Sequence, residues 1–267
     1  MTWLFALAAI TYALASTLML RRRDDANTGA ARAALMTGMV AMLAHAVGHV
    51  IEIQRAGGIP LGFFAALSWV SLGMAALSTL VAWTRTFAAL GVMVFPLAAL
   101  VSLGYALLPR AQAAPDLSWP LQLHAGFALL AYATLAVAAV MAVLLALQDR
   151  LLRQRQLDHA LLRRLPPLTE LESLMFRCVA AGFALLTLAL ALGVVFVEDL
   201  FAQHLVHKTV LSVLSWMVFG ALLFGRWRYG WRGRRAIRLT LAAMALLLLA
   251  FFGSRFVLEL LLHRTPY

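Results

Sequence analysis

The stretch AGFALLAYATLAVAAVMAVLLAL, residues 125–147, decides the fold class because it contains no charged residue along its whole length. A helix rises about 1.5 Å per residue, so such a run is long enough to cross the roughly 30 Å hydrocarbon core of a bilayer. The rest of the sequence is similarly apolar, since 64% of its 267 residues are hydrophobic and 12% are charged. This composition is typical of a membrane protein that crosses the bilayer several times.

Further runs of about 20 apolar residues lie on both sides of this stretch. Together they predict an all-α polytopic membrane helix bundle with about eight transmembrane helices, in a single membrane domain over residues 1–267. The expected spans are approximately 2–20, 32–53, 61–83, 87–108, 119–147, 174–197, 205–225 and 238–262.

Basic residues orient these spans, because Lys and Arg concentrate in the cytoplasmic loops of membrane proteins. All but five of the 22 basic residues fall on one side of the predicted spans. The five are Arg55, Arg110, Lys208, Arg255 and Arg264. We therefore expect both termini outside, and we interpret the net charge of +11 as a sign of topology rather than of nucleic-acid binding.

Two cytoplasmic segments have patterns of their own. Between residues 148 and 177, leucines recur at near-helical spacing among Arg and Gln. They indicate either an amphipathic helix at the membrane surface, ended by Pro166 and Pro167, or a plain extension of the fifth span. The stretch RWRYGWRGRR, residues 226–235, places basic residues beside Trp227 and Trp231, which favours contact with anionic lipid.

Five ionisable side chains inside the predicted spans fall toward the outer side: His45, His49, His124, His207 and Arg255. Such groups are costly in lipid, so each is a functional candidate. His45 and His49 are four residues apart and share a helix face with Glu52. The histidine pair could bind a metal ion or form hydrogen bonds between helices; no cysteine or acidic cluster completes a zinc shell.

His124 and His207 lie at similar depth on two different spans, so they could supply the two axial nitrogens of a haem iron. An unaided histidine at this depth is more often an interfacial residue that contacts headgroups or water. Arg255 needs an anionic partner, because an unpaired charge is expensive in lipid. A carboxylate such as a haem propionate could pair with it bidentately, and a structural ion pair with Glu52 or Glu259 is the alternative.

Other chemistries are excluded by what the sequence lacks. The single cysteine, Cys178, leaves no intrachain disulfide, no CxxC pair and no CxxCH haem-attachment site, so the chain is not itself a c-type cytochrome. No nucleophile with a partner base and no complete metal set emerges, and we do not expect an enzyme.

Several motifs occur together in a familiar order and spacing. They are IPLGFFAALSW (59–69), LQLHAGFALLAYATL (121–135), LPPLTELESLMFR (165–177), GFALLTLALALG (182–193), HKTVLSVLSW (207–216), GWRGRRA (230–236) and FFGSR (251–255). Over spans two to eight the chain therefore resembles the CcsA-type cytochrome c assembly protein family, and within it an eight-helix, YpjD-like branch. The resemblance implies a multi-pass protein of the bacterial inner membrane, a role in cytochrome c biogenesis and association with haem b.

The resemblance also assigns residues. His124 matches the family histidine that is one axial ligand of the outward-facing haem, and His263 falls within about one position of the second outer ligand. His207 stands where the family has a proline, so it would be a ligand of this branch alone. The family's tryptophan-rich WWD segment should lie between Phe196 and His207, but no tryptophan occurs there, and Phe224 replaces an inner haem ligand.

We therefore expect a haem-binding membrane protein that holds or handles non-covalent haem b near the outer leaflet. His124 and His207 would ligate the iron, His263 would be the alternate ligand, and Arg255 would contact a propionate. Membrane lipid and another membrane subunit of cytochrome c maturation are the expected partners. The alternative is a haem-free transporter or accessory subunit in which His45, His49, Glu52 and Arg255 form a proton or ion pathway.

Overall fold

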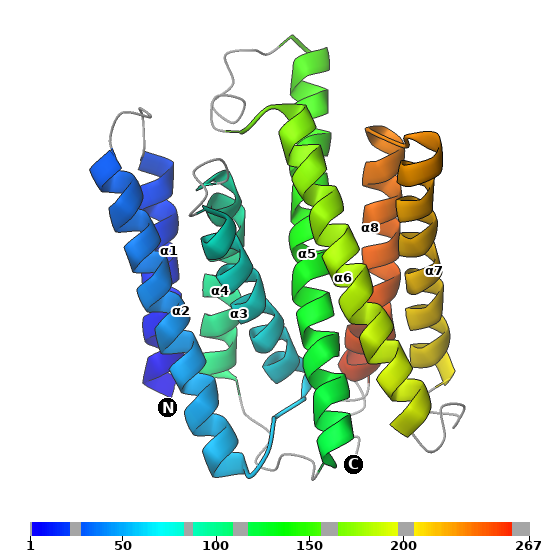
Figure 1. Cartoon of the computed structure of the whole chain (residues 1–267). Helices are drawn as coiled ribbons and strands as arrows, with labels where there is room; N and C mark the ends of the chain where they lie inside the picture. The colour runs from blue at the N-terminus through cyan, green and yellow to red at the C-terminus, as the bar shows by residue number, and fades with distance from the viewer. Residues whose placement is uncertain are drawn as a thin grey trace. The chain divides into compact units, whose positions relative to one another are not determined.

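The computed structural model describes residues 2–21, 28–82, 88–108, 117–155, 165–196 and 206–257. Within these ranges the chain is almost entirely helical and contains no strand (Figure 1). Eight of the helices are long and apolar enough to cross a membrane. The prediction of an all-α polytopic membrane protein is therefore confirmed.

The chain divides into two compact units. The first, residues 1–116, contains four helices: α1 (Thr2–Arg21), α2 (Thr28–Ala56), α3 (Phe63–Ala82) and α4 (Ala88–Leu107). Within this unit α1 packs against α2 and α4, and α3 packs against α4 and α2. The expectation of one membrane domain over the whole chain stays a prediction.

Large aromatic side chains fill the interior of the first unit. Phe5 and Tyr12 of α1 and Phe95 of α4 are fully buried. Gly48 permits the close approach of α1, because a Cβ atom added there would lie 3.0 Å from the Phe5 ring. The small residue lets the Phe5 ring reach the part of α2 that carries the two histidines.

The second unit, residues 117–267, contains the remaining helices. They are α5 (Trp119–Arg153), α6 (Leu168–Phe196), α7 (Val206–Tyr229) and α8 (Arg234–Leu248), and α8 continues into a π-helical turn, η1 (Leu249–Gly253). α6 and α8 each pack against both α5 and α7. α5 and α7 therefore occupy opposite corners of this unit, and both begin at the end where α6 stops (Figure 1).

The helices extend beyond several of the predicted spans. α5 runs on to Arg153, six residues past the expected end, so the extension of the fifth span is confirmed up to that residue. α6 begins at Leu168 instead of 174, because the Pro167 carbonyl accepts the backbone N–H groups of Glu170 and Leu171 and starts the helix there. The leucines of the predicted surface helix at 157, 161 and 162 lie outside the described residues.

Two carboxylates tie the turn between α7 and α8 to the rest of the second unit. Asp149 of α5 accepts hydrogen bonds from Arg153 and Arg234, and Glu172 of α6 lies 3.4 Å from Arg226. These contacts hold a strongly basic turn in place, beside Trp227, whose side chain is 80% exposed. The exposed indole fits the predicted contact with lipid.

Candidate functional site

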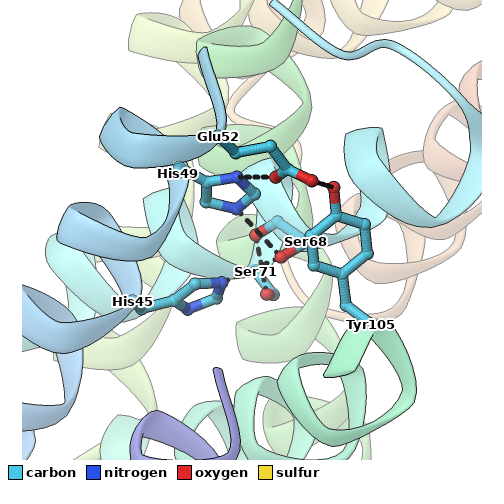
Figure 2. Close-up of polar contacts among 6 residues, drawn as sticks. All are labelled: His45, His49, Glu52, Ser68, Ser71 and Tyr105. Atoms are coloured by element: carbon cyan, nitrogen blue, oxygen red, sulfur yellow. Dashed lines mark hydrogen bonds and ion pairs between the residues drawn. The ribbon is translucent and has the colours of Figure 1, made fainter. Parts of the chain in front are cut away.

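Buried polar side chains gather at one place in the first unit, where α2, α3 and α4 meet (Figure 2). His45 and His49 of α2 and Ser68 of α3 are fully buried, and Glu52 is 7% exposed. The sequence prediction that the two histidines and Glu52 share one helix face is therefore confirmed. Ser68 and Tyr105 complete the cluster from two other helices.

A series of polar contacts joins these side chains. The Nε2 atoms of His45 and His49 each lie 2.9 Å from the same oxygen, Ser68 Oγ. Nδ1 of His49 lies 3.5 Å from Oε2 of Glu52, and the Tyr105 hydroxyl donates to Oε1 of Glu52 at 2.7 Å. The contacts connect these side chains in series from Tyr105 to His45 (Figure 2).

Aromatic rings enclose this chain. The indole of Trp69 stacks on the His49 ring with centroids 4.0 Å apart, and the His45 and His49 rings stack at 5.2 Å. Phe5 makes T-shaped contacts with both histidines. The rings exclude water, and a polar group in such surroundings depends on the partners that the protein itself provides.

The structure favours the hydrogen-bonding interpretation of the histidine pair over the metal interpretation. Within the described residues, no group of three or more His, Cys, Asp or Glu side chains is placed to hold a metal ion. Both Nε2 atoms are instead directed at a hydroxyl of a neighbouring helix. Hydrogen bonds of this kind hold transmembrane helices together.

The second unit contains the other predicted site residues, and His124 has the most defined surroundings among them. It lies near the start of α5, half-buried, with its Nδ1 2.8 Å from the backbone carbonyl of Ala189 in α6. A carbonyl oxygen can only accept, so Nδ1 must carry the proton. In the neutral ring Nε2 then keeps its lone pair, which is the form of imidazole that binds a metal.

Gly193 makes room for this ring. A Cβ atom added at Gly193 would lie 3.2 Å from Cε1 and 3.4 Å from Nδ1 of His124. The glycine is one helical turn beyond Ala189, so α6 provides both the hydrogen-bond acceptor and the gap into which the ring fits. The orientation of His124 is therefore determined by backbone features of its neighbour.

Arg255 lies just beyond η1, at the end of the second unit where α5 begins. It is 7% exposed, and its guanidinium carbon lies 5.7 Å from the centroid of the Phe251 ring. Tyr132 of α5 donates a hydrogen bond to the Leu247 carbonyl, next to the point where α8 widens into the π-helix. Such π-helical turns are frequent at functional sites.

The remaining predicted ligands are less constrained. His207 is the second residue of α7 and is exposed, and no contact between His207 and His124 occurs among the described residues. His263 and Glu259 lie outside the described residues. Arg255 belongs to the second unit and His45, His49 and Glu52 to the first, where the three residues of α2 lie together.

Sequence reasoning missed several residues that define these sites. Ser68, Trp69 and Tyr105 belong to the buried cluster, and Ala189 and Gly193 orient His124. A polar side chain inside an apolar span was an available signal for Ser68 and Tyr105. Nothing in the local sequence marks Ala189, since its contribution is a backbone carbonyl.

The fold and these sites define the class of the protein. It is a helical membrane protein with eight helices that can cross the membrane and with buried ionisable side chains. A model of the cytochrome c assembly protein family matches residues 3–262. The chain therefore belongs to the cytochrome c assembly protein family, as its motifs predict.

Individual relatives agree with this assignment. The inner membrane protein YpjD of Escherichia coli K12 is 33% identical over 266 residues, which cover 96% of this chain and 97% of YpjD. An uncharacterised 28.8 kDa protein of Azospirillum brasilense is 40% identical over 144 residues, 53% of each chain. The chain is a multi-pass protein of the inner membrane, as expected.

The likeness to CcsA itself is partial. The cytochrome c biogenesis protein CcsA of Prochlorococcus marinus MIT 9303 is 31% identical over 86 residues, which cover 32% of this chain and 27% of that protein. No solved structure matches the chain significantly.

Proposed function

We propose that the chain binds haem b non-covalently at the outer end of its second unit, with Nε2 of His124 as an axial ligand of the iron. Membership of the cytochrome c assembly family motivates the cofactor. The partial relative CcsA is named for cytochrome c biogenesis, and the maturation of a cytochrome c requires haem. The proposed role is to hold or handle haem in the membrane during that process.

The observation that carries the proposal is the hydrogen bond from Nδ1 of His124 to the Ala189 carbonyl. Histidines that ligate metals almost always donate their second ring N–H to a carbonyl, a carboxylate or water. This bond fixes both the tautomer and the orientation of the ring. An interfacial histidine that only meets water and headgroups would not need such a fixed acceptor inside the protein.

The residues at this end also fit the remaining parts of a haem. α5 and α7 lie at opposite corners of the unit, so His207, at the start of α7, could provide a second ligand from a facing helix. His263 is the alternate. Arg255 is buried at the same end and has the planar donors that pair with a carboxylate, which suits a propionate.

When bound, haem would supply an iron centre that can change its oxidation state. The contribution of the chain would be to present an imidazole nitrogen and to neutralise a propionate. The segment at residues 196–206 contains no tryptophan, so we limit the proposed role to holding or handling haem and do not include presentation to an apocytochrome.

Titration of haemin into the purified protein in detergent tests this proposal. We expect His124→Gln to weaken haem affinity by more than about 100-fold, because loss of a ligand costs more than loss of a group that supports one. His207→Gln and His263→Gln identify the second ligand, since of these two variants the one that removes a ligand should convert a six-coordinate spectrum into a five-coordinate one.

Equal affinity of wild type and His124→Gln would contradict the proposed ligand. Absence of saturable binding in the wild type would favour the alternative of a haem-free transporter or accessory subunit. A circular dichroism spectrum of each variant must show unchanged helicity for the comparison to hold.

A further inference from the structure

We infer that the buried cluster of the first unit is a proton-transfer chain in which one mobile proton is shared among Glu52, His49 and His45. All of its residues belong to α2, α3 and α4 of the first unit, whereas the residues of the proposed haem site belong to the second. The proton moves along the series of polar contacts drawn in Figure 2.

The number of mobile protons follows from the cost of burying charge. Glu52, His49 and His45 are the three side chains of the cluster with a carboxyl or imidazole group, which can bind or release a proton. A net charge is expensive in a buried, ring-lined site, so the neutral cluster is strongly favoured. With a carboxylate on Glu52 and two neutral imidazoles, the cluster has a charge of −1. One additional proton makes it neutral, and that proton can reside on Glu52, His49 or His45.

The hydrogen bonds connect these three positions. A proton on Oε2 of Glu52 moves to Nδ1 of His49, across the 3.5 Å contact, and the proton on Nε2 of His49 moves to Ser68 Oγ. The original hydroxyl proton of Ser68 moves to Nε2 of His45. Glu52 ends as a carboxylate, His49 and Ser68 stay neutral and His45 becomes an imidazolium, so the net charge does not change.

Ser68 is essential to this path because its hydroxyl oxygen contacts both rings. A hydroxyl has one proton to donate and two lone pairs to accept with, so it can receive a proton from one ring while giving its own to the other. The convergence of both Nε2 atoms on this one oxygen, each at 2.9 Å, is the arrangement that such a transfer requires.

The two ends of the proton path, Glu52 and His45, differ in their exposure. Glu52, with 10% of its side chain exposed, is the end through which a proton can enter. His45 is fully buried, and its Nδ1 lacks a hydrogen-bond partner among the described residues. His45 is therefore the inner end of the path.

One aromatic contact favours a cation on His49. The indole face of Trp69 lies against His49, and an aromatic face attracts a cationic ring. The titratable groups that contact the cluster from other described helices are Tyr12 of α1, near His45, and Tyr105 of α4, which donates to Glu52. Neither carries a positive charge that would repel the proton.

Nitrogen NMR of ¹⁵N-histidine-labelled protein in lipid vesicles tests the inference, because its shifts distinguish protonated from unprotonated ring nitrogens. As the pH is lowered, we expect the His45 and His49 signals of the wild type to change together. In Ser68→Ala the change at His49 should remain and the coupled change at His45 should be lost. His45→Gln and His49→Gln assign the two signals.

Ser71→Ala is the matched control. Ser71 is also buried, but its hydroxyl donates to the backbone carbonyl of Ser68 and stands outside the proton path. This variant should titrate like the wild type. If Ser68→Ala does not fold, Ser68→Cys keeps the shape of the side chain and leaves only a weak donor, so it should reduce the same coupling.

Glu52→Gln provides the second arm, since the amide can replace the hydrogen-bonding shape of the carboxyl group without exchanging its proton. Neither ring should then titrate as in the wild type. The inference is overturned if both histidines keep one neutral tautomer at every pH in the wild type, or if Ser68→Ala alters His45 no more than Ser71→Ala does.

Discussion

His124 and His49 are both intramembrane histidines, but the atoms around them give the two rings different chemistry. His124 donates to a backbone carbonyl that can never return a proton, so its tautomer is fixed. His49 lies between a hydroxyl and a carboxyl group, which can both give and take protons. A fixed ring suits a metal ligand, and a ring between two exchanging partners suits proton transfer.

Gly193→Ala tests whether the position of the His124 ring matters. The added methyl group would lie 3.2 Å from Cε1, so the ring must move by a few tenths of an ångström and weaken its bond to Ala189. We expect roughly tenfold weaker haem binding, as for other losses of support to a metal ligand. The measurement is the dissociation constant for haemin.

Gly104→Ala is the control for that change, because nothing lies within 4 Å of the Cβ position at Gly104. It should bind haem like the wild type. Identical dissociation constants for the two alanine variants would show that α6 does not orient the ligand.

The sequence predicted correctly which residues share a helix face, because helical periodicity alone determines this. The spacing of His45, His49 and Glu52 fixes their shared face before any tertiary structure exists. The partners Ser68 and Tyr105 depend on how α3 and α4 are rotated and shifted against α2. That arrangement is a property of the packed unit, and a single sequence does not contain a direct signal for it.

Among the elements, α5 and α6 form the extended helix pair on which the proposed haem ligand depends. Their close approach requires a residue without a side chain at Gly182, where an added Cβ would lie 2.6 Å from Cδ2 of the buried Leu135. Small residues at such contacts allow membrane helices to pack along their length. The pair in turn brings Ala189 against His124.

Gly182→Ala is therefore expected to lower the free energy of unfolding by about 1–3 kcal/mol, the usual cost of an overpacked core. Denaturant unfolding in detergent, followed by circular dichroism, measures this change. Gly126→Ala, on the other helix of the pair, meets nothing within 4 Å and should be neutral or slightly stabilising. Equal stability of the two variants would contradict the tight contact.

The positions of the helices along the sequence were predictable from apolar runs, and their ends were not. Hydrophobicity located α5 and α6, but α5 continues to Arg153 and α6 starts at Leu168 because helical hydrogen bonds extend past the apolar core. Charged residues in these ends are then used in ion pairs, such as that of Glu172 with Arg226. A composition-based boundary marks the hydrocarbon layer rather than the end of the helix.

In the whole molecule, two compact units carry two different kinds of polar site. The first unit encloses a series of polar contacts, and the second positions an imidazole nitrogen and a buried guanidinium. Family membership was readable from ordered motifs across the chain, whereas this division into units was not. The orientation with both termini outside stays a prediction from the distribution of Lys and Arg.

The absorption spectrum of the protein purified from haem-replete cells tests the central claim most directly. The account predicts a Soret band in the wild type that is lost in His124→Gln and retained in His45→Gln, a matched change in the other unit. Absence of the band in the wild type, or its loss in His45→Gln alone, would contradict the assignment of haem to the second unit.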